Sequence, residues 1–204
     1  MAFIDLRRCA PAAVAVAALL IWPASARAHL TDTGLGPVYD GIAHLLLSFD
    51  DLLPVVALAL LAGLNGAGAG RVVLFALPAV WLACGMVAAV VAGPAPPAAV
   101  TSLSMVALGL LTAVSVRLAQ PAVMAIALAL GLMHGWLNGA AIAAAGREAI
   151  GLVGIAGTIF VIVALTSALV VSLKVPWARI AVRVAGSWVA ASGLLTLGWA
   201  LRTG

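Results

Sequence analysis

Two clusters of polar residues interrupt an otherwise apolar sequence, and both contain side chains that bind metal ions. The first cluster contains His44, Asp50 and Asp51, and the second contains His134 and Asn138. Neutral imidazole and carboxylate together suit divalent nickel, zinc, cobalt or manganese, whereas monovalent copper prefers thiolate and thioether ligands. The five residues therefore predict a site for a divalent transition-metal cation.

The acidic cluster is expected to lie inside a membrane. The apolar run that follows Asp51 ends at Gly63, and it is shorter than the roughly 20 residues that a spanning helix needs. A span at this place must therefore include Asp50 and Asp51. A charged side chain at that depth costs about 2.5 to 3.5 kcal/mol and normally faces a protein interior or a water-filled cavity. We therefore expect both carboxylates to have a function.

The spacing within the first cluster leaves the principal carboxylate open. On a continuous helix His44 and Asp51 share one face, while Asp50 points about 120° away. Pro54 cannot donate a hydrogen bond to the carbonyl of Asp50, which predicts a kink there. His44 and Asp51 would lie about 10 Å apart along such a helix, too far to share one ion. Either the helix is broken between them, or His44 lies at the mouth of the site and the aspartates bind deeper. We favour the second arrangement.

The second cluster lies beside a row of small residues. Gly131, Gly135 and Gly139 recur at every fourth position, and such a ridge lets another helix approach closely. His134 and Asn138 flank this ridge. Since no lysine or arginine lies at matching depth, we expect His134 to face the buried acids rather than to be a purely structural residue. We therefore expect a site in the outer half of the membrane, between the first and fourth helices.

Composition places the chain among polytopic membrane proteins. Of its 204 residues, 66% are hydrophobic and 8% are charged, and the mean hydropathy is +1.28. This composition leaves no room for a separate soluble domain. The net charge of +4 is explained by topology signals, so we infer no nucleic-acid partner. Cys84 is interpreted as a packed, inert thiol.

The chain is expected to be all-α, with a cleavable signal peptide and about six transmembrane helices. Residues 1–28 combine an early arginine pair, an apolar run and the segment Ala26-Arg27-Ala28, which is typical of a signal peptide and its cleavage site. Cleavage would leave His29 at the periplasmic N-terminus, as a flexible tail or a metal-chelating end. The remaining residues, 29–204, form one transmembrane domain, with helices at about 41–64, 72–92, 99–116, 122–145, 150–173 and 180–201.

The cationic residues predict the orientation. With the N-terminus outside, five of them lie at the cytoplasmic face and two lie outside: Arg71, Arg117, Lys174, Arg179 and Arg183 against Arg147 and Arg202. This distribution follows the positive-inside rule for a bacterial cytoplasmic membrane, and it puts the C-terminus outside.

The two clusters, in this order behind a leader peptide, resemble the HupE/UreJ family of small polytopic proteins associated with nickel supply to hydrogenase and urease. The first family motif is approximately HPxxGxDH, and residues 44–51 read HLLLSFDD. The resemblance implies that His44 and Asp50 handle the metal, and Asp51 stands where a second histidine is usual. The second motif is approximately HGxAHGxE, and residues 134–141 read HGWLNGAA. Its second histidine is replaced by Asn138 and its glutamate by Ala141.

Three functions compete. We favour a permease for a divalent cation, with nickel first and zinc, cobalt, manganese or copper as alternatives; its partners are membrane lipid and the metal ion. The alternative is a non-transporting metal-delivery or assembly factor, whose partner would be a metalloenzyme maturation system. A zinc-dependent intramembrane hydrolase is the third. No G-x-S-x-G signature is present in the sequence, and the resemblance does not support catalysis, so we expect no enzymatic activity.

Overall fold

The structure is a computed structural model that describes residues 32–91 and 98–203. These residues form seven α-helices and contain no strand. The helices are α2 (Pro37–Leu47), α3 (Phe49–Leu64), α4 (Ala67–Val91), α5 (Ala98–Ala113), α6 (Gln120–Ala144), α7 (Gly151–Ser172) and α8 (Pro176–Thr203). The predicted signal peptide and His29 lie outside the described residues.

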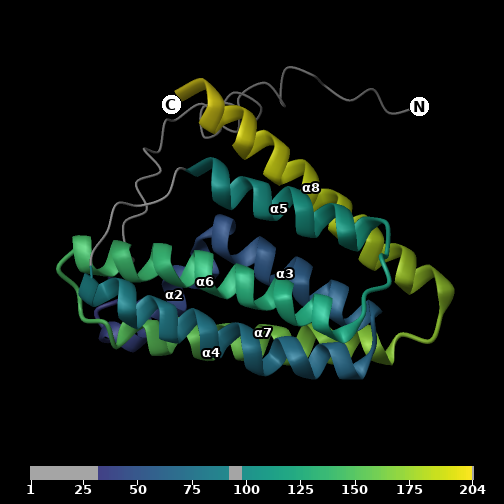
Figure 1. Ribbon diagram of the computed structural model, residues 1–204, viewed down its shortest axis with the longest axis horizontal. Helices are drawn as coiled ribbons and strands as arrows, with labels where there is room; N and C mark the ends of the chain where they lie inside the picture. The colour runs from purple at the N-terminus through teal and green to yellow at the C-terminus, as the bar shows by residue number, and fades with distance from the viewer. Residues whose placement is uncertain (1–31, 92–97, 204) are drawn as a thin grey trace, which may run out of the picture.

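Helix α3 lies at the centre of the molecule. In Figure 1 it runs between the α5 and α8 pair on one side and α4, α6 and α7 on the other. The neighbouring helices cover α3 almost all round. From Pro54 to Gly63, only Val56 is not buried. The short helix α2 packs against α7 and against the beginning of α3.

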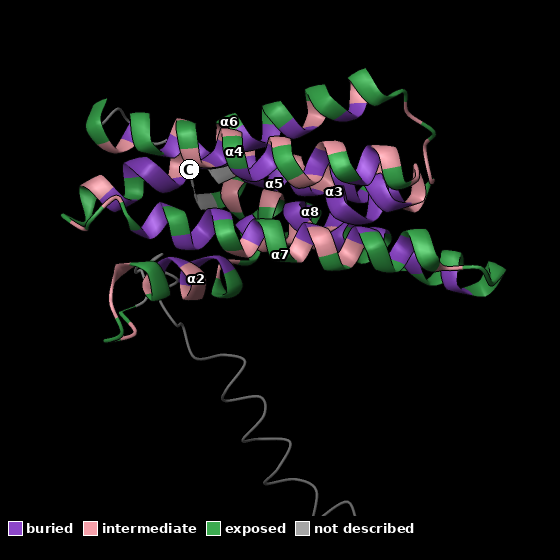
Figure 2. Cartoon of the chain, turned by 90° about the horizontal axis from the view of Figure 1, so that it is seen from below, coloured by how far each residue is buried: buried purple, intermediate pink, exposed green. Residues whose placement is uncertain are grey.

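Helices α4, α6, α7 and α8 are each long and apolar enough to cross a membrane, and α2 with α3 qualifies as a fifth, bent span. Helix α5 has 16 residues, fewer than the roughly 20 of a full span. In Figure 2 exposed residues follow the outward faces of the helices. Large apolar side chains lie there, and Leu165, Leu195 and Val90 are 69%, 76% and 85% exposed. Such faces suit lipid, and the chain is a multi-pass membrane protein.

The predicted continuous helix over 41–64 is wrong. Helix α2 ends at Leu47, α3 begins at Phe49, and the two are bent by 75°. Ser48 between them is extended, with φ −89° and ψ 94°. Its amide donates to the carbonyl of His44 (2.9 Å) and its carbonyl accepts from the amide of Leu52 (2.8 Å), so one hydrogen-bond ladder ends and another begins there. The bend therefore falls at Ser48, and Pro54, where we predicted the kink, lies inside α3.

The glycine ridge of α6 allows a close helix contact, as predicted, and the helix that packs there is α4. A Cβ atom on Gly135 would collide with the backbone of Trp81, and one on Gly139 would collide with the backbone of Gly85. Gly151 and Gly154 of α7 approach the backbone of α2 in the same way, whereas Gly157 has no neighbour within 4 Å. The close contact between α6 and α4 fixes the rotation of α6, and with it the direction of the polar residues beside the ridge.

Candidate metal site

Asp51 is the centre of a buried polar cluster. It lies in the first turn of α3 and is 4% exposed. Its Oδ1 is 2.6 Å from Nδ1 of His134, and its Oδ2 accepts a hydrogen bond of 2.9 Å from Nδ2 of Asn138. His134 and Asn138 are both buried and stand one turn apart on α6. The structure thus brings the carboxylate of one predicted cluster against the imidazole and amide of the other.

His44, in the last turn of α2, approaches Asp51, in the first turn of α3. Its Nε2 is 3.6 Å from Oδ2 of Asp51, although a continuous helix would hold the two residues about 10 Å apart. The bend at Ser48 makes this approach possible. Ser48 also places its hydroxyl oxygen 3.4 Å from Nδ1 of His44. The structure therefore has the broken helix, which we did not favour, and not the favoured arrangement with His44 at a separate mouth.

The two helix ends carry opposite partial charges at this bend. His44 is in the last turn of α2, and Asp51 is in the first turn of α3. A helix N-terminus carries partial positive charge and a C-terminus partial negative charge. The partial negative end of α2 and the partial positive end of α3 therefore meet at this bend, beside His44 and Asp51.

His134 is held on its other sides by two residues that the sequence analysis missed. Its ring stacks on Trp81 of α4, with ring centroids 5.2 Å apart and planes at 27°. Its Nε2 lies 3.2 Å from the hydroxyl oxygen of Ser104 on α5. No sequence signal marks either residue, because each contributes only through its contact with another helix.

The contacts of Ser104 indicate which ring nitrogen of His134 carries a hydrogen. The Ser104 hydroxyl oxygen lies 2.7 Å from the carbonyl oxygen of Thr101, and two oxygens at that distance need a hydrogen between them. The carbonyl has none, so the single hydroxyl hydrogen of Ser104 points to it. Ser104 therefore accepts a hydrogen bond from His134, and Nε2 of His134 carries a hydrogen.

The short contact between His134 and Asp51 also contains a proton. A ring nitrogen and a carboxylate oxygen 2.6 Å apart must share a hydrogen. The pair is therefore an imidazolium and a carboxylate, or an imidazole and a carboxylic acid. In both cases a metal ion bound to these two atoms takes the place of one proton.

Two buried polar atoms in this region have no hydrogen-bond partner among the described residues. They are Oδ1 of Asn138 and Nε1 of Trp81. Buried polar atoms are nearly always paired. The free Oδ1 of Asn138 belongs to the amide that already contacts Asp51, and an amide oxygen is a suitable ligand for a divalent cation. The donor set around Asp51 therefore fits a cation.

The cluster around Asp51 does not form a ready metal site in this structure. Among residues 32–91 and 98–203, no group of three or more histidine, cysteine, aspartate or glutamate side chains is placed to hold a metal ion. Oδ1 of Asp51 is instead in contact with Nδ1 of His134. The predicted ligand Asp50 is exposed; its charge acts on Asp51, His44 and His134, but among the described residues its carboxylate makes no hydrogen bond or ion pair with them. The bend at Ser48, rather than a shared helical face, brings His44 to Asp51, and the role that the family motif implies for Asp50 stays a prediction.

Comparison with known proteins agrees with these features. Residues 17–196 match the model of the family described as HupE / UreJ protein. The chain belongs to the HupE/UreJ family. HupE/UreJ proteins are associated with nickel or cobalt transport, or with urease and hydrogenase maturation, and the family is transporter-like or accessory rather than a known enzyme family. No curated protein and no solved structure matches the chain.

Proposed function

We propose that this HupE/UreJ protein is a permease for a divalent transition-metal cation, with nickel as the first candidate. The observation that carries the proposal is the contact of Asp51, buried within the helical bundle, with two imidazoles. His134 lies 2.6 Å from its carboxylate and His44 lies 3.6 Å from it. A buried carboxylate is costly in a membrane and is found where it serves an ion or proton pathway.

In this proposal the cluster around Asp51 replaces the hydration shell of the ion. The carboxylate oxygens of Asp51, Nδ1 of His134, Nε2 of His44 and Oδ1 of Asn138 are the ligands. Binding requires that His134 release the proton it shares with Asp51 and that His44 move closer. Because α2 is packed closely against α7, the second step requires only a small movement of the His44 side chain.

We further propose that the protein spans the bacterial cytoplasmic membrane with its mature N-terminus in the periplasm. The support is the charge distribution of the chain. Arg71, Arg117 and Lys174, together with two arginines of α8, lie at the end of the bundle that carries the α3–α4, α5–α6 and α7–α8 connections. Such an excess of positive charge is typical of the cytoplasmic face.

The test is uptake of radioactive nickel into liposomes that contain the purified protein. We expect the wild-type chain to accumulate nickel and Asp51→Asn to lose at least about tenfold of the initial rate, since removal of supporting groups alone costs 10- to 100-fold at metal sites. Asp32→Asn is the matched control, because Asp32 is an exposed carboxylate that lies before α2 and outside the cluster, and we expect it to transport normally. Equal uptake by wild type and Asp51→Asn, for nickel and cobalt alike, would reject the proposal.

The closed geometry favours a second candidate, a non-transporting metal-delivery factor. Asp51 and His134 are paired, and among the described residues no three-ligand group is preformed. A chain that binds metal only when it meets an acceptor protein would have such a closed site. Liposomes separate the two functions, because a delivery factor without its acceptor protein would not accumulate nickel inside vesicles, whereas a permease would.

A further inference from the structure

One end of the bundle carries positive charge without acidic partners. The cations are Arg71, Arg117, Lys174, Arg179 and Arg183, which lie near the α3–α4, α5–α6 and α7–α8 connections. The acidic residues of the described chain lie elsewhere: Asp32 and Asp40 at the beginning of α2, Asp50 and Asp51 at the bend, and Glu148 after α6. Charges gathered at this end must be balanced by anions from outside the chain.

Three of these arginines line one cavity. Arg117, Arg179 and Arg183 surround a space of about 370 Å³ between the ends of α3 and α5 and the beginning of α8. Leu64 and Ile180 contribute apolar surface to the same cavity. The chain thus places three permanent positive charges beside apolar walls, at the end of a membrane bundle.

Two of the guanidinium groups are fixed by helix ends. Nε of Arg183 donates to the carbonyl of Ala113 at the end of α5 (2.8 Å), and Nη2 of Arg179 lies 3.4 Å from the carbonyl of Leu64 at the end of α3. These carbonyls have no partner within their own helices. The contacts hold the arginines in place but neutralise no charge, and each guanidinium keeps further N–H groups for an anion.

An apolar strip leads from the cavity along α8. Ile180, which lines the cavity, is followed at every fourth position by Val184 and Trp188, and the three are 57%, 48% and 73% exposed. Residues four apart lie on the same face of a helix. Trp177, 69% exposed, stands near the beginning of this strip, where an interfacial anchor is expected. The strip has the form of a path for an acyl chain that starts at the arginines.

We propose that this cavity binds the phosphate of an anionic phospholipid. The three arginines supply the charge and the fork-shaped donors that phosphate prefers, and the strip on α8 accommodates a chain that free phosphate lacks. Basic pockets between transmembrane helices bind anionic headgroups in this way. This site is separate from the metal cluster, and the inference does not depend on the proposed transport.

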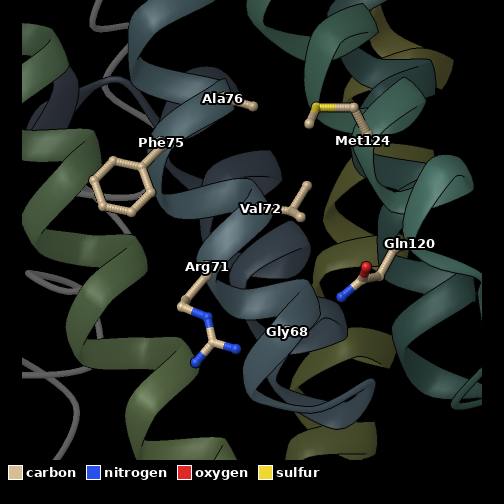
Figure 3. Close-up of a pocket in the computed structure, with 7 residues that line it drawn as sticks. All are labelled: Gly68, Arg71, Val72, Phe75, Ala76, Gln120 and Met124. Carbon is tan, nitrogen blue, oxygen red and sulfur yellow. The ribbon is translucent and has the colours of Figure 1, made fainter.

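A second cavity at the same end supplies a matched control. It lies between α4 and α6 and is lined by Arg71 as its single charged residue, with Val72, Gln120 and Met124 among its other residues. In Figure 3 the guanidinium of Arg71 points away from Gln120 and Met124. Loss of Arg71 changes the net charge of this end as much as loss of Arg117 does, without removing an arginine from the proposed site.

The experiment is native mass spectrometry of the purified full-length chain in detergent with defined lipids. The probes are phosphatidylglycerol, which is anionic, and phosphatidylcholine, which carries a phosphate but no net charge. We expect the wild-type chain to retain phosphatidylglycerol in preference to phosphatidylcholine. Arg117→Gln should weaken phosphatidylglycerol binding by about fivefold, the equivalent of about 1 kcal/mol per basic residue near an anionic surface. Arg71→Gln should leave it unchanged.

Arg117 is the primary variant because, among the described residues, no hydrogen bond or ion pair is found for its side chain, so its loss should not disturb the fold. Arg183→Lys keeps the positive charge but loses the fork-shaped donors of the guanidinium. It should weaken phosphatidylglycerol binding less than Arg183→Gln. Equal retention of the two lipids, or equal effects of Arg71→Gln and Arg117→Gln, would overturn the proposal. Release of bound phosphatidylglycerol by millimolar inorganic phosphate would overturn the lipid as ligand and indicate a site for free phosphate.

Discussion

The carboxylate of Asp51 meets Nδ1 of His134 at 2.6 Å, although the two residues lie 83 positions apart in the chain. This contact joins α3 to α6, but α6 makes most of its contacts with α4. The position of His134 is therefore determined by the packing of the glycine ridge of α6 against α4 and by the stacking of its ring on Trp81. Substitutions that act on this support are expected to change the site without removing a ligand.

We expect Asn138→Leu to weaken nickel binding by roughly 10- to 100-fold, the usual effect of losing a group that supports a metal site. The change removes both the hydrogen bond to Asp51 and the free Oδ1, while the side chain keeps a similar size. The measurement is isothermal titration of the purified chain with nickel. Gln120→Leu makes the same chemical change at the other end of α6 and should bind normally; equal affinities for all three chains would contradict the role of Asn138.

Ser104→Ala should lower the affinity for nickel by about tenfold, the smaller effect expected of an outer-shell partner. It removes the acceptor of the Nε2 hydrogen of His134 and leaves that hydrogen buried and unpaired. The control is Ser192→Ala, which removes a hydroxyl bound to a carbonyl of α8, far from His134 in sequence and on another helix. If both variants lose affinity to the same extent, the loss belongs to the bundle and not to the imidazole.

Nickel binding should release about one proton per ion, since the metal takes the place of the proton shared by His134 and Asp51. The release is measured with a pH indicator in weakly buffered detergent solution. Because protons compete with the metal, the affinity should fall as the pH falls. Asp51→Asn should release none. Tight binding to the wild-type chain with no change in pH would show that the ion binds elsewhere.

Gly135→Ala should destabilise the bundle by about 1 to 3 kcal/mol, the usual cost of overpacking. The added Cβ would collide with the backbone of Trp81 and push α6 away from α4. Gly157→Ala introduces the same atom on α7 into open space, and its effect should stay within about 0.5 kcal/mol. Thermal unfolding of both variants in detergent is the measurement, and equal stability would argue against close packing at the ridge.

A reporter fusion tests the proposed orientation. Alkaline phosphatase joined to the C-terminus should be active, because the enzyme folds in the periplasm and the proposed orientation puts the C-terminus there. A fusion truncated after Arg117 should be inactive, since the proposed orientation puts this residue at the cytoplasmic end. The opposite pattern of activities would mean that the chain is inserted the other way round.

Much of the architecture follows from local pattern. The apolar runs predict the helices α4 to α8 to within a few residues, because the need to bury backbone polar groups in lipid leaves few alternatives to a helix. The glycine spacing of α6 likewise predicts a close helix contact, and the structure supplies its partner, α4. In both cases the signal lies within a single segment of the chain, so that no knowledge of the neighbours is required.

The order of residues is enough to show that carboxylates and imidazoles lie within apolar segments and have to meet other groups there. It could not determine which aspartate does so. A continuous helix and a broken one have the same composition, and only the bend at Ser48 brings His44 to Asp51 and leaves Asp50 exposed. The contacts of Trp81 and Ser104 with His134 could not be predicted from the sequence for a related reason. Their roles depend on how α4 and α5 are rotated against α6, and that rotation is decided by packing between helices rather than by any pattern within one of them.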